Sequence, residues 1–354
     1  MICTTSPKYP RAAFAERRIE LDPTDRTPPD LALTPTRIRA ADIAADALRM
    51  VRTRIQSWIG RASYPELISD GFSAVTVDKG LTLSALRRAH CLPYVGGSLE
   101  GETVAVLGCG YGLDLLTWFP YRPARILAVD VVNYADAWRR LEQLGREHGI
   151  EIECIQYDLT QPHWDFAQPG SVRLSSAFQV LEHISDLPTF LAANRELLGA
   201  GGVFEAVYGP LWYGPHGDHV YPRSEDRIFN HLLLDDHEYD QYVEDTLSEW
   251  EHHDTGMEGP FLLQRGLFSF LRPREYLDAF REASYDVAFA HAVLSSDAQR
   301  FRRRNPNAWA EMKRRRQLRD VDLLVKSTTL VSRVCQGASP SRSRRRRSPS
   351  HPQA

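Results

Sequence analysis

The sequence predicts an α/β fold built on a doubly wound, mostly parallel sheet. A short run of strand-forming residues at 103–107 leads through three glycines into an apolar pattern typical of a helix. A second apolar strand at 126–130 ends in the carboxylate of Asp130, and an alternating strand follows at 150–159. Strands that alternate with helical segments are typical of parallel sheets with helices on both faces.

The turn after the first strand carries Gly108, Gly110 and Gly112 at alternate positions. Glycine suits such a turn because the backbone must adopt positive φ and let a ligand approach where a Cβ would collide. The N-terminus of the next helix then presents unpaired amides to that ligand. A dinucleotide fingerprint would need a third glycine at position 113, which is Leu113, so a nicotinamide dehydrogenase is not favoured. Three such glycines also fit a turn that needs them for packing alone.

Four motifs in order resemble the class I S-adenosylmethionine-dependent methyltransferases of the small-molecule type. They are the G-x-G-x-G loop at 108–112, the acid Asp130, the V-L-E-H sequence at 180–183, and the turn at 198–202 before a fifth strand at 203–207. The resemblance covers residues 95–210. It implies a seven-stranded, mostly parallel, Rossmann-like sheet and S-adenosyl-L-methionine as the cofactor.

The resemblance also implies where the cofactor lies. The glycine loop would lie under its amino-acid end, Asp130 would accept hydrogen bonds from its ribose, and Asp158 would face its adenine. Gln179 would stand near the methyl-bearing end. The expected cofactor-binding residues are Gly108, Cys109, Gly110, Gly112, Asp130, Val131, Asp158, Leu159 and Gln179.

Two positions depart from the pattern of the resembled family. Its members carry an acid two residues before the first glycine, where it holds the ammonium group of the cofactor, and this chain has Val106. A charge-assisted contact of that kind is worth about 1.5–3 kcal/mol. A second acid is replaced by Arg173 before the fourth strand. A non-catalytic domain that keeps the fold is therefore an alternative.

The loop after the fifth strand, residues 208–221, combines aromatic side chains with histidines. A loop at the carboxyl end of a central strand is where an open α/β sheet places its ligand. The loop resembles a G-P-L-W-x-G-P-x-G-H-H segment of a methyltransferase subgroup, and it equally fits a loop packed by its own rings. Histidines suit proton removal near neutral pH, so His183, His216 and His219 are the candidate catalytic residues.

We expect no metal site in this chain. His216, Asp218 and His219 lie close together in the sequence, but their spacing in a loop fits no strong metal-binding template. The five cysteines are also scattered without the spacing of metal ligands.

Composition indicates a cytoplasmic protein with no membrane span. The chain has no run of about 18 apolar residues, its first residues lack the apolar core of a signal peptide, and its scattered cysteines suggest reduced thiols. We expect a small-molecule or glycan-like acceptor and no nucleic-acid partner. The oligomeric state stays open.

Charge is distributed unevenly along the chain. Residues 301–354 carry 15 Lys and Arg against 3 Asp and Glu, whereas the preceding part carries 28 against 43. Basic clusters can contact phosphates, so an RNA methyltransferase that uses the C-terminal clusters is a second alternative.

The composition further predicts four regions. Residues 1–37 are rich in proline and form a disordered leader, and 38–100 form an N-terminal helical cap. The methyltransferase domain covers 101–335, with a helical insertion at about 209–265 over the mouth of the site. Residues 336–354 form a disordered basic tail.

Overall fold

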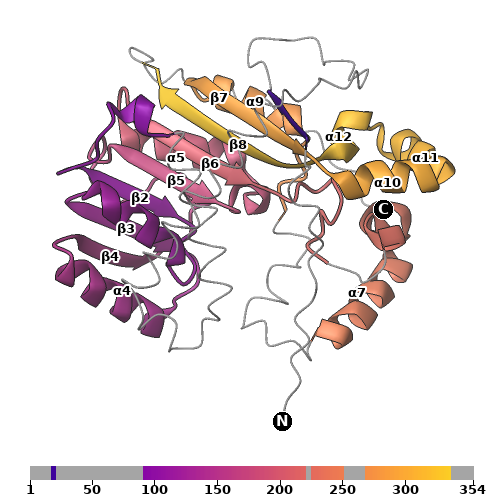
Figure 1. Cartoon of the computed structure of the whole chain (residues 1–354), viewed down its shortest axis with the longest axis horizontal. Helices are drawn as coiled ribbons and strands as arrows, with labels where there is room; N and C mark the ends of the chain where they lie inside the picture. Colours follow the sequence, from indigo (N-terminus) through magenta and orange to yellow (C-terminus); the bar gives the residue numbers. More distant parts are fainter. Residues whose placement is uncertain (1–16, 21–90, 221–224, 251–267, 336–354) are drawn as a thin grey trace, which may run out of the picture.

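The computed structural model describes residues 17–20, 91–220, 225–250 and 268–335. The described strands form one sheet in the order β1-β7-β8-β6-β5-β2-β3-β4 (Figure 1). Their bounds are β1 Arg17–Glu20, β2 Thr103–Leu107, β3 Arg125–Asp130, β4 Glu151–Gln156, β5 Leu174–Phe178, β6 Val203–Tyr208, β7 Tyr285–Leu294 and β8 Val325–Val334.

Parallel pairing dominates the centre of the sheet. β4, β3, β2, β5 and β6 run parallel, and β8 pairs antiparallel with both β6 and β7. The predicted doubly wound, seven-stranded sheet is confirmed. The structure adds β1, which pairs antiparallel with β7 at the edge. These four residues lie in the segment expected to be disordered, so that expectation is wrong for them.

Helices cover both faces of the sheet because its central strands are apolar on both sides. Val104 and Val106 of β2 contribute to one hydrophobic core, and Ala105 and Leu107 contribute to the other. On the first face lie η3 (Leu113–Tyr121) and α4 (Ala135–Glu147); on the second lie α5 (Leu187–Leu198) and α9 (Pro273–Glu282). Two short turns, η2 (Leu92–Val95) and η4 (Leu181–His183), lie before β2 and after β5.

Local sequence determines where α5 begins and ends. The Asp186 side chain accepts a hydrogen bond from the Thr189 amide and so satisfies one free donor of the first turn. Pro188 lies in the first turn, where no backbone donor is lost. Gly199 ends the helix. These signals place the preceding V-L-E-H segment in the short connection between β5 and α5.

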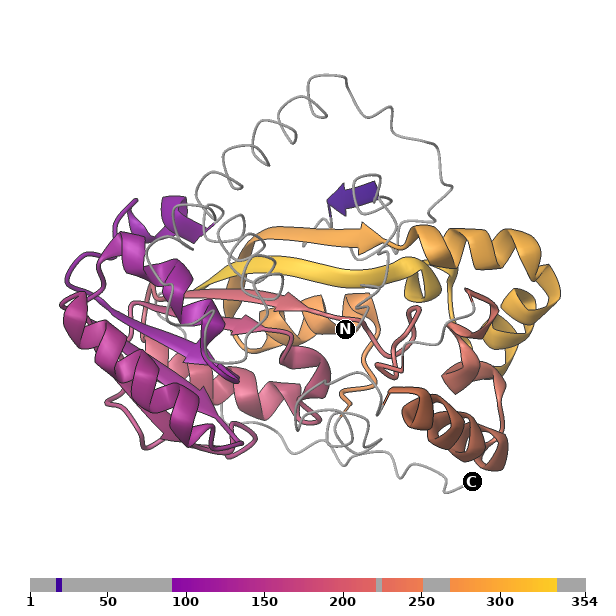
Figure 2. The same cartoon turned by 60° about the horizontal axis from the view of Figure 1, so that its bottom comes forward.

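The other helices lie on the side to which the parallel strands point (Figures 1 and 2). They are η5 (Glu225–Arg227), α6 (Asn230–Leu233), α7 (Asp236–Trp250), α10 (Ser296–Arg304), α11 (Pro306–Arg316) and α12 (Asp320–Leu324). α6 and α7 fall in the predicted insertion at 209–265. The rest of the predicted leader, residues 38–90 of the predicted cap, part of the insertion and the predicted tail lie outside the described residues. Within the described ranges, no helix is long and apolar enough to cross a membrane.

The Phe204 side chain gives a direct test of the packing between β6 and the helices behind it. It is fully buried and lies 5.6 Å from the ring of Phe280 and 6.1 Å from that of Phe190. We expect Phe204→Ala to lower the free energy of unfolding by about 3–5 kcal/mol, because it leaves a cavity in a packed core. Urea denaturation followed by circular dichroism measures this, and Phe204→Leu should lose clearly less. Equal losses in the two variants would contradict the packing described.

Candidate functional site

The glycine loop connects β2 to η3 with a backbone that turns repeatedly into the left-handed region. Gly108, Gly110 and Gly112 have φ values of 71°, 51° and 84°. A Cβ on Gly108 would lie 2.2 Å from Val180 Cγ2, and one on Gly112 would lie 2.1 Å from Leu141 Cδ1. No atom of the described chain lies within 4 Å of a Cβ built on Gly110. Two glycines therefore serve packing, and the middle one faces open space.

Asp130 organises this loop from the end of β3. Its Oδ2 accepts a hydrogen bond of 2.7 Å from the Gly110 amide, and its Oδ1 accepts one of 3.0 Å from the Val132 amide. Burial raises the pKa of Asp130, although these amides oppose the shift. Each carboxylate oxygen can accept a further hydrogen bond, so Asp130 can shape the loop and also bind hydroxyl groups of a ligand.

Aromatic residues support the loop from the other side. Trp138 Nε1 donates a hydrogen bond of 2.8 Å to the Gly110 carbonyl, and the rings of Tyr111 and Tyr134 lie 4.4 Å apart. The sequence prediction did not include Tyr111 or Trp138. Their only sequence signal is proximity to the glycines or to the start of the next helix, which does not distinguish them from ordinary packing residues.

The remaining predicted cofactor residues differ in exposure. The Cys109 side chain is buried, and that burial raises the pKa of its thiol well above the usual value. Val131 is 48% exposed although it follows a buried strand, which leaves an apolar surface beside Asp130. Leu159 is buried in the core. It therefore contributes shape to the site rather than an exposed contact.

Asp158 lies in the turn after β4. Its carboxylate accepts hydrogen bonds from the Thr160 amide, the Thr160 hydroxyl and Gln161 Nε2. Burial acts to raise the pKa of Asp158, but these hydrogen bonds outweigh it and leave the pKa below its ordinary value. Asp158 is thus ionised near neutral pH and is an acceptor for a donor group at this edge.

The segment 179–185 after β5 joins the glycine loop to the next part of the site. Gln179 has φ of 56°, its amide donates 2.7 Å to the Val207 carbonyl, and its Nε2 lies 3.4 Å from the Gly209 carbonyl oxygen. Glu182 is fully buried, and its Oε1 accepts a hydrogen bond of 2.8 Å from the Gly209 amide. Burial raises the pKa of Glu182 to about 8.

Two of the three predicted catalytic histidines meet beside Glu182. The ring centroids of His183 and His219 lie 4.7 Å apart, and both rings lie 5.3 Å from that of Phe268. Burial, followed by the charge that His183 carries when protonated, lowers the pKa of His219 to about 3. The structure therefore holds His219 as a neutral imidazole.

His216 and Asp218 have other surroundings. His216 Nδ1 lies 3.3 Å from the Val220 carbonyl oxygen, and burial lowers the pKa of His216. Asp218 is buried and accepts hydrogen bonds from the Tyr239 hydroxyl at 3.1 Å and the Val220 amide at 3.2 Å. Asp218 thus connects the loop after β6 to α7. His216 does not belong to the group formed by Glu182, His183 and His219.

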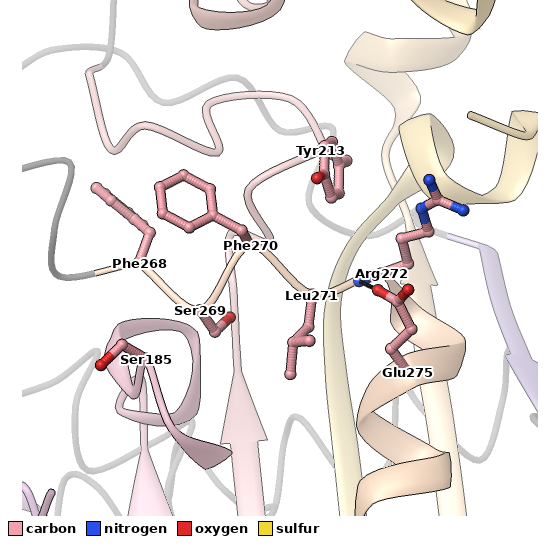
Figure 3. A pocket seen from close by; sticks show the side chains of 8 residues that line it. All are labelled: Ser185, Tyr213, Phe268, Ser269, Phe270, Leu271, Arg272 and Glu275. Atoms are coloured by element: carbon pink, nitrogen blue, oxygen red, sulfur yellow. Dashed lines mark hydrogen bonds between the residues drawn. The ribbon is translucent and has the colours of Figure 1, made fainter. Parts of the chain in front are cut away.

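A cavity of ≈ 420 Å³ lies on the far side of the turn after β5, around Ser185 and Phe268 (Figure 3). Its lining combines aromatic rings with a few polar groups: Ser185, Tyr213, Phe268, Ser269, Phe270, Leu271, Arg272 and Glu275. Phe268 contacts the ring of His183, and the Ser269 amide donates 2.8 Å to the Glu182 carbonyl. The cavity is therefore continuous with the segment that carries the predicted catalytic residue His183.

A family model described as a methyltransferase domain matches residues 105–206, which run from β2 into β6. Residues 105–206 of the chain form a methyltransferase domain. The match contains every predicted cofactor-binding residue of the methyltransferase. It ends before the loop that carries His219 and before most of the residues that line the cavity.

Solved structures with a similar fold include several methyltransferases. A putative methyltransferase from Bacillus halodurans is 14% identical, with 70% of this chain and 98% of that chain covered and a TM-score of 0.41. Geranyl diphosphate C-methyltransferase from Streptomyces coelicolor is 13% identical, with 75% and 84% covered and a TM-score of 0.43. Phosphoethanolamine N-methyltransferase 2 from Haemonchus contortus is 12% identical, with 71% and 53% covered and a TM-score of 0.42. No curated protein matches the chain.

The two departures from the pattern lie in different places in the methyltransferase. Val106 is buried among apolar side chains of β2 and its neighbours. Arg173 precedes β5, at the opposite end of the strand from the glycine loop, and its guanidinium donates 3.2 Å to the Gly201 carbonyl. Only the Val106 position is near the expected amino-acid end of the cofactor.

Gly110 and Gly112 allow a matched test of the loop. We expect Gly112→Ala to lower the free energy of unfolding by about 2–5 kcal/mol, because its backbone is also left-handed and its Cβ would in addition collide with Leu141. Gly110→Ala should cost about 1–2 kcal/mol for the left-handed backbone, and it should weaken binding of S-adenosylhomocysteine at least about tenfold. Urea denaturation and calorimetric titration measure the two effects. Wild-type affinity in Gly110→Ala would show that this glycine does not face the cofactor.

Proposed function

We propose that this methyltransferase transfers a methyl group from S-adenosylmethionine to a small-molecule or glycan-like acceptor held in the cavity beside His183. The observation that carries the proposal is the continuity of the site. Val180 contacts Gly108, Glu182 binds the Ser269 amide through its carbonyl, and Phe268 and Ser269 line the cavity. One segment of seven residues thus connects the glycine loop to a cavity whose volume suits a small ligand.

The residues around the glycine loop fit the cofactor. Open space at Gly110 admits the amino-acid end, and Asp130 retains acceptor capacity for ribose hydroxyls. Val131 offers an exposed apolar surface for adenine, and Asp158 offers an ionised acceptor for its amino group. Cys109 and Leu159 shape the site from its buried side, and Gln179 stands between the loop and Gly209. When bound, the cofactor supplies a methyl group on a sulfonium centre.

The chain must orient the acceptor, exclude water and accept a proton where the acceptor carries one. His183 and His219 both contact Phe268, which lines the cavity, and His219 is neutral. An imidazole beside the acceptor would accept the proton that the acceptor loses on methylation, and the low pKa of His219 makes it a weak base, so this role falls to His183. His216 serves this proposal less well because its Nδ1 contacts the Val220 carbonyl within its own loop.

The described basic clusters give little support to an RNA acceptor. Arg302 and Lys313 form ion pairs with Asp320, at 3.1 Å and 2.7 Å. Arg314 and Arg315 pair with Glu311, and Arg300 pairs with Asp297. Five of the eight basic residues of α10 and α11 thus share three acids, which compensates part of the positive charge and weakens the attraction of this surface for phosphates.

Calorimetric titration with S-adenosylmethionine and S-adenosylhomocysteine tests cofactor binding. We expect binding of both by the intact protein and at least about a hundredfold loss in Asp130→Ala, equivalent to about 2.7 kcal/mol, because the variant loses the ribose acceptor and the bond to the Gly110 amide. Asp136→Ala is the matched control, since its carboxylate lies on the exposed surface of α4. No binding by the intact protein would favour the non-catalytic alternative.

The size of the acceptor is tested with the labelled cofactor. The purified protein is incubated with methyl-labelled S-adenosylmethionine and an extract of its host cells, which is then separated by filtration. We expect the label in the small-molecule or glycan fraction, because a cavity of ≈ 420 Å³ admits a small ligand or a terminal sugar. Label in a ribonuclease-sensitive fraction would instead identify RNA as the acceptor.

A further inference from the structure

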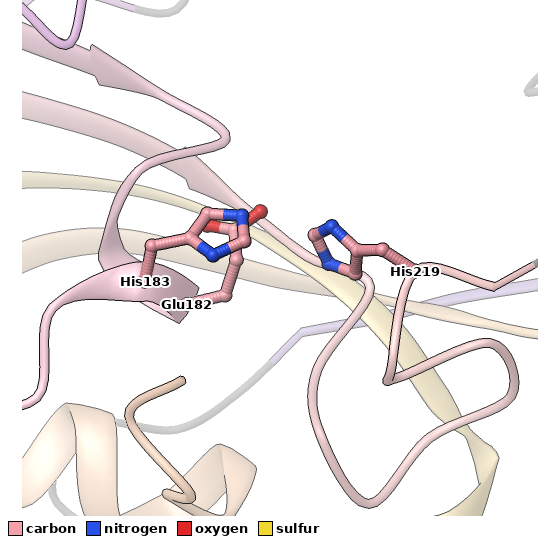
Figure 4. A group of neighbouring side chains, drawn as sticks. All are labelled: Glu182, His183 and His219. Atoms are coloured by element: carbon pink, nitrogen blue, oxygen red, sulfur yellow. The ribbon is translucent and has the colours of Figure 1, made fainter. Parts of the chain in front are cut away.

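Three metal-ligating side chains from distant parts of the sequence meet at one point of this site. Glu182 and His183 come from the turn after β5, and His219 comes from the loop after β6. One potential ligand atom from each lies within 4.8 Å of the others. Figure 4 shows the two imidazole rings next to each other, edge to face, with the Glu182 side chain beside that of His183. We propose that Glu182, His183 and His219 bind a divalent first-row transition-metal ion such as Zn²⁺, contrary to the expectation from sequence spacing that the chain has no metal site.

The donor set suits such an ion. Two imidazoles and one carboxylate bind zinc and related divalent metals, and they leave positions open for water or a substrate oxygen. Three ligands about 2.1 Å from one ion lie roughly 3.4 Å apart in tetrahedral geometry. The separation in the structure is at most 4.8 Å, so modest side-chain rotation brings the three ligand atoms onto one ion. Histidine rings pivot readily about their side-chain bonds.

The surroundings of Glu182 point to a cation. The side chain is buried, and its Oε1 is held by the Gly209 amide at 2.8 Å. Its Oε2 is also buried and has no hydrogen-bond partner among the residues that the structure describes. A buried carboxyl group avoids the cost of an isolated charge by staying protonated, and a bound cation lets it ionise. A cation near Oε2 would satisfy the atom that the protein leaves without a donor.

Backbone contacts also orient the ligands. Nε2 of His219 lies 3.3 Å from the Pro210 carbonyl oxygen. A metal-binding histidine commonly donates its second ring N–H to a carbonyl, which fixes the ring and leaves the other nitrogen for the metal. With its proton on Nε2, His219 offers Nδ1 as the ligand. The Gly209 amide orients the Glu182 carboxylate in the same way, so consecutive residues, Gly209 and Pro210, position two of the three ligands.

The location gives the ion a role that rests on the proposed function. His183 and His219 both contact Phe268, which lines the cavity. An ion bound here would hold an acceptor oxygen near Phe268 and lower the pKa of its hydroxyl, and it would then activate the acceptor in place of a histidine base. Metal binding itself needs only the three side chains, so it is tested without any acceptor.

The test is a calorimetric titration of the full chain, previously treated with a chelator, with Zn²⁺. We expect one high-affinity site per chain that is weakened at least about tenfold in His183→Ala, in His219→Ala and in Glu182→Gln. His237→Ala is the matched control, because this histidine lies on the exposed surface of α7. Co²⁺ added to the wild type should give visible absorption bands of a four- or five-coordinate site, and His219→Ala should lose them.

Two results would overturn the proposal: no binding of Zn²⁺ by the wild type, or equal affinity in His183→Ala, His219→Ala and His237→Ala. Circular dichroism establishes that each variant folds, and the two histidine variants test the site even if Glu182→Gln does not fold. Titration of the same samples with S-adenosylhomocysteine distinguishes failure of the proposed metal site from failure of the proposed methyltransferase function. Cofactor binding without metal binding would leave the methyltransferase site intact and remove only the metal.

Discussion

The hydrogen bond from the Gly209 amide to the buried carboxylate of Glu182 is the contact on which the site depends. It joins the turn after β5 to the loop after β6, the two chain segments that carry His183 and His219. Parallel strands end at the same edge of a sheet, so these segments emerge side by side. A short contact between a carboxylate and a backbone amide then determines how closely they approach. The cavity behind Phe268 is bounded by the same turn.

Asp130 and Val106 illustrate how the fold distributes charge around the glycine loop. Each carboxylate oxygen of Asp130 accepts one hydrogen bond from a backbone amide, so the residue expected to bind ribose also holds the loop that is expected to contact the cofactor. Val106 lies in a buried strand with 2% of its surface exposed. A carboxylate there would need a cationic partner to offset the cost of burial. The chain instead fills the position with an apolar side chain that packs in the core.

The basic residues near the C-terminus have a structural role in the fold that their sequence does not indicate. As a run of letters, Arg302–Arg304 and Lys313–Arg316 are typical of phosphate-binding segments. In the fold, Asp320 lies between α10 and α11 and pairs with a cation from each, which holds these helices together. Hydrogen bonding to Lys313 and Trp309 leaves the pKa of Asp320 below its ordinary value, although burial opposes this. Part of the charge therefore stabilises the fold.

The sequence alone determined the architecture, and it predicted which residues form the cofactor side of the site. The glycine spacing, the acid at the end of the second strand and the V-L-E-H turn are local patterns, and each keeps its meaning because backbone geometry and strand ends follow from nearby residues. Only the tertiary structure showed which residues form the other part of the site, around His183 and the cavity. His219 was separated from the neighbouring His216 and placed beside Glu182 and His183, and Phe268 to Glu275 were brought to line the cavity. Such contacts join residues tens of positions apart, and no local pattern specifies the packing that brings them together.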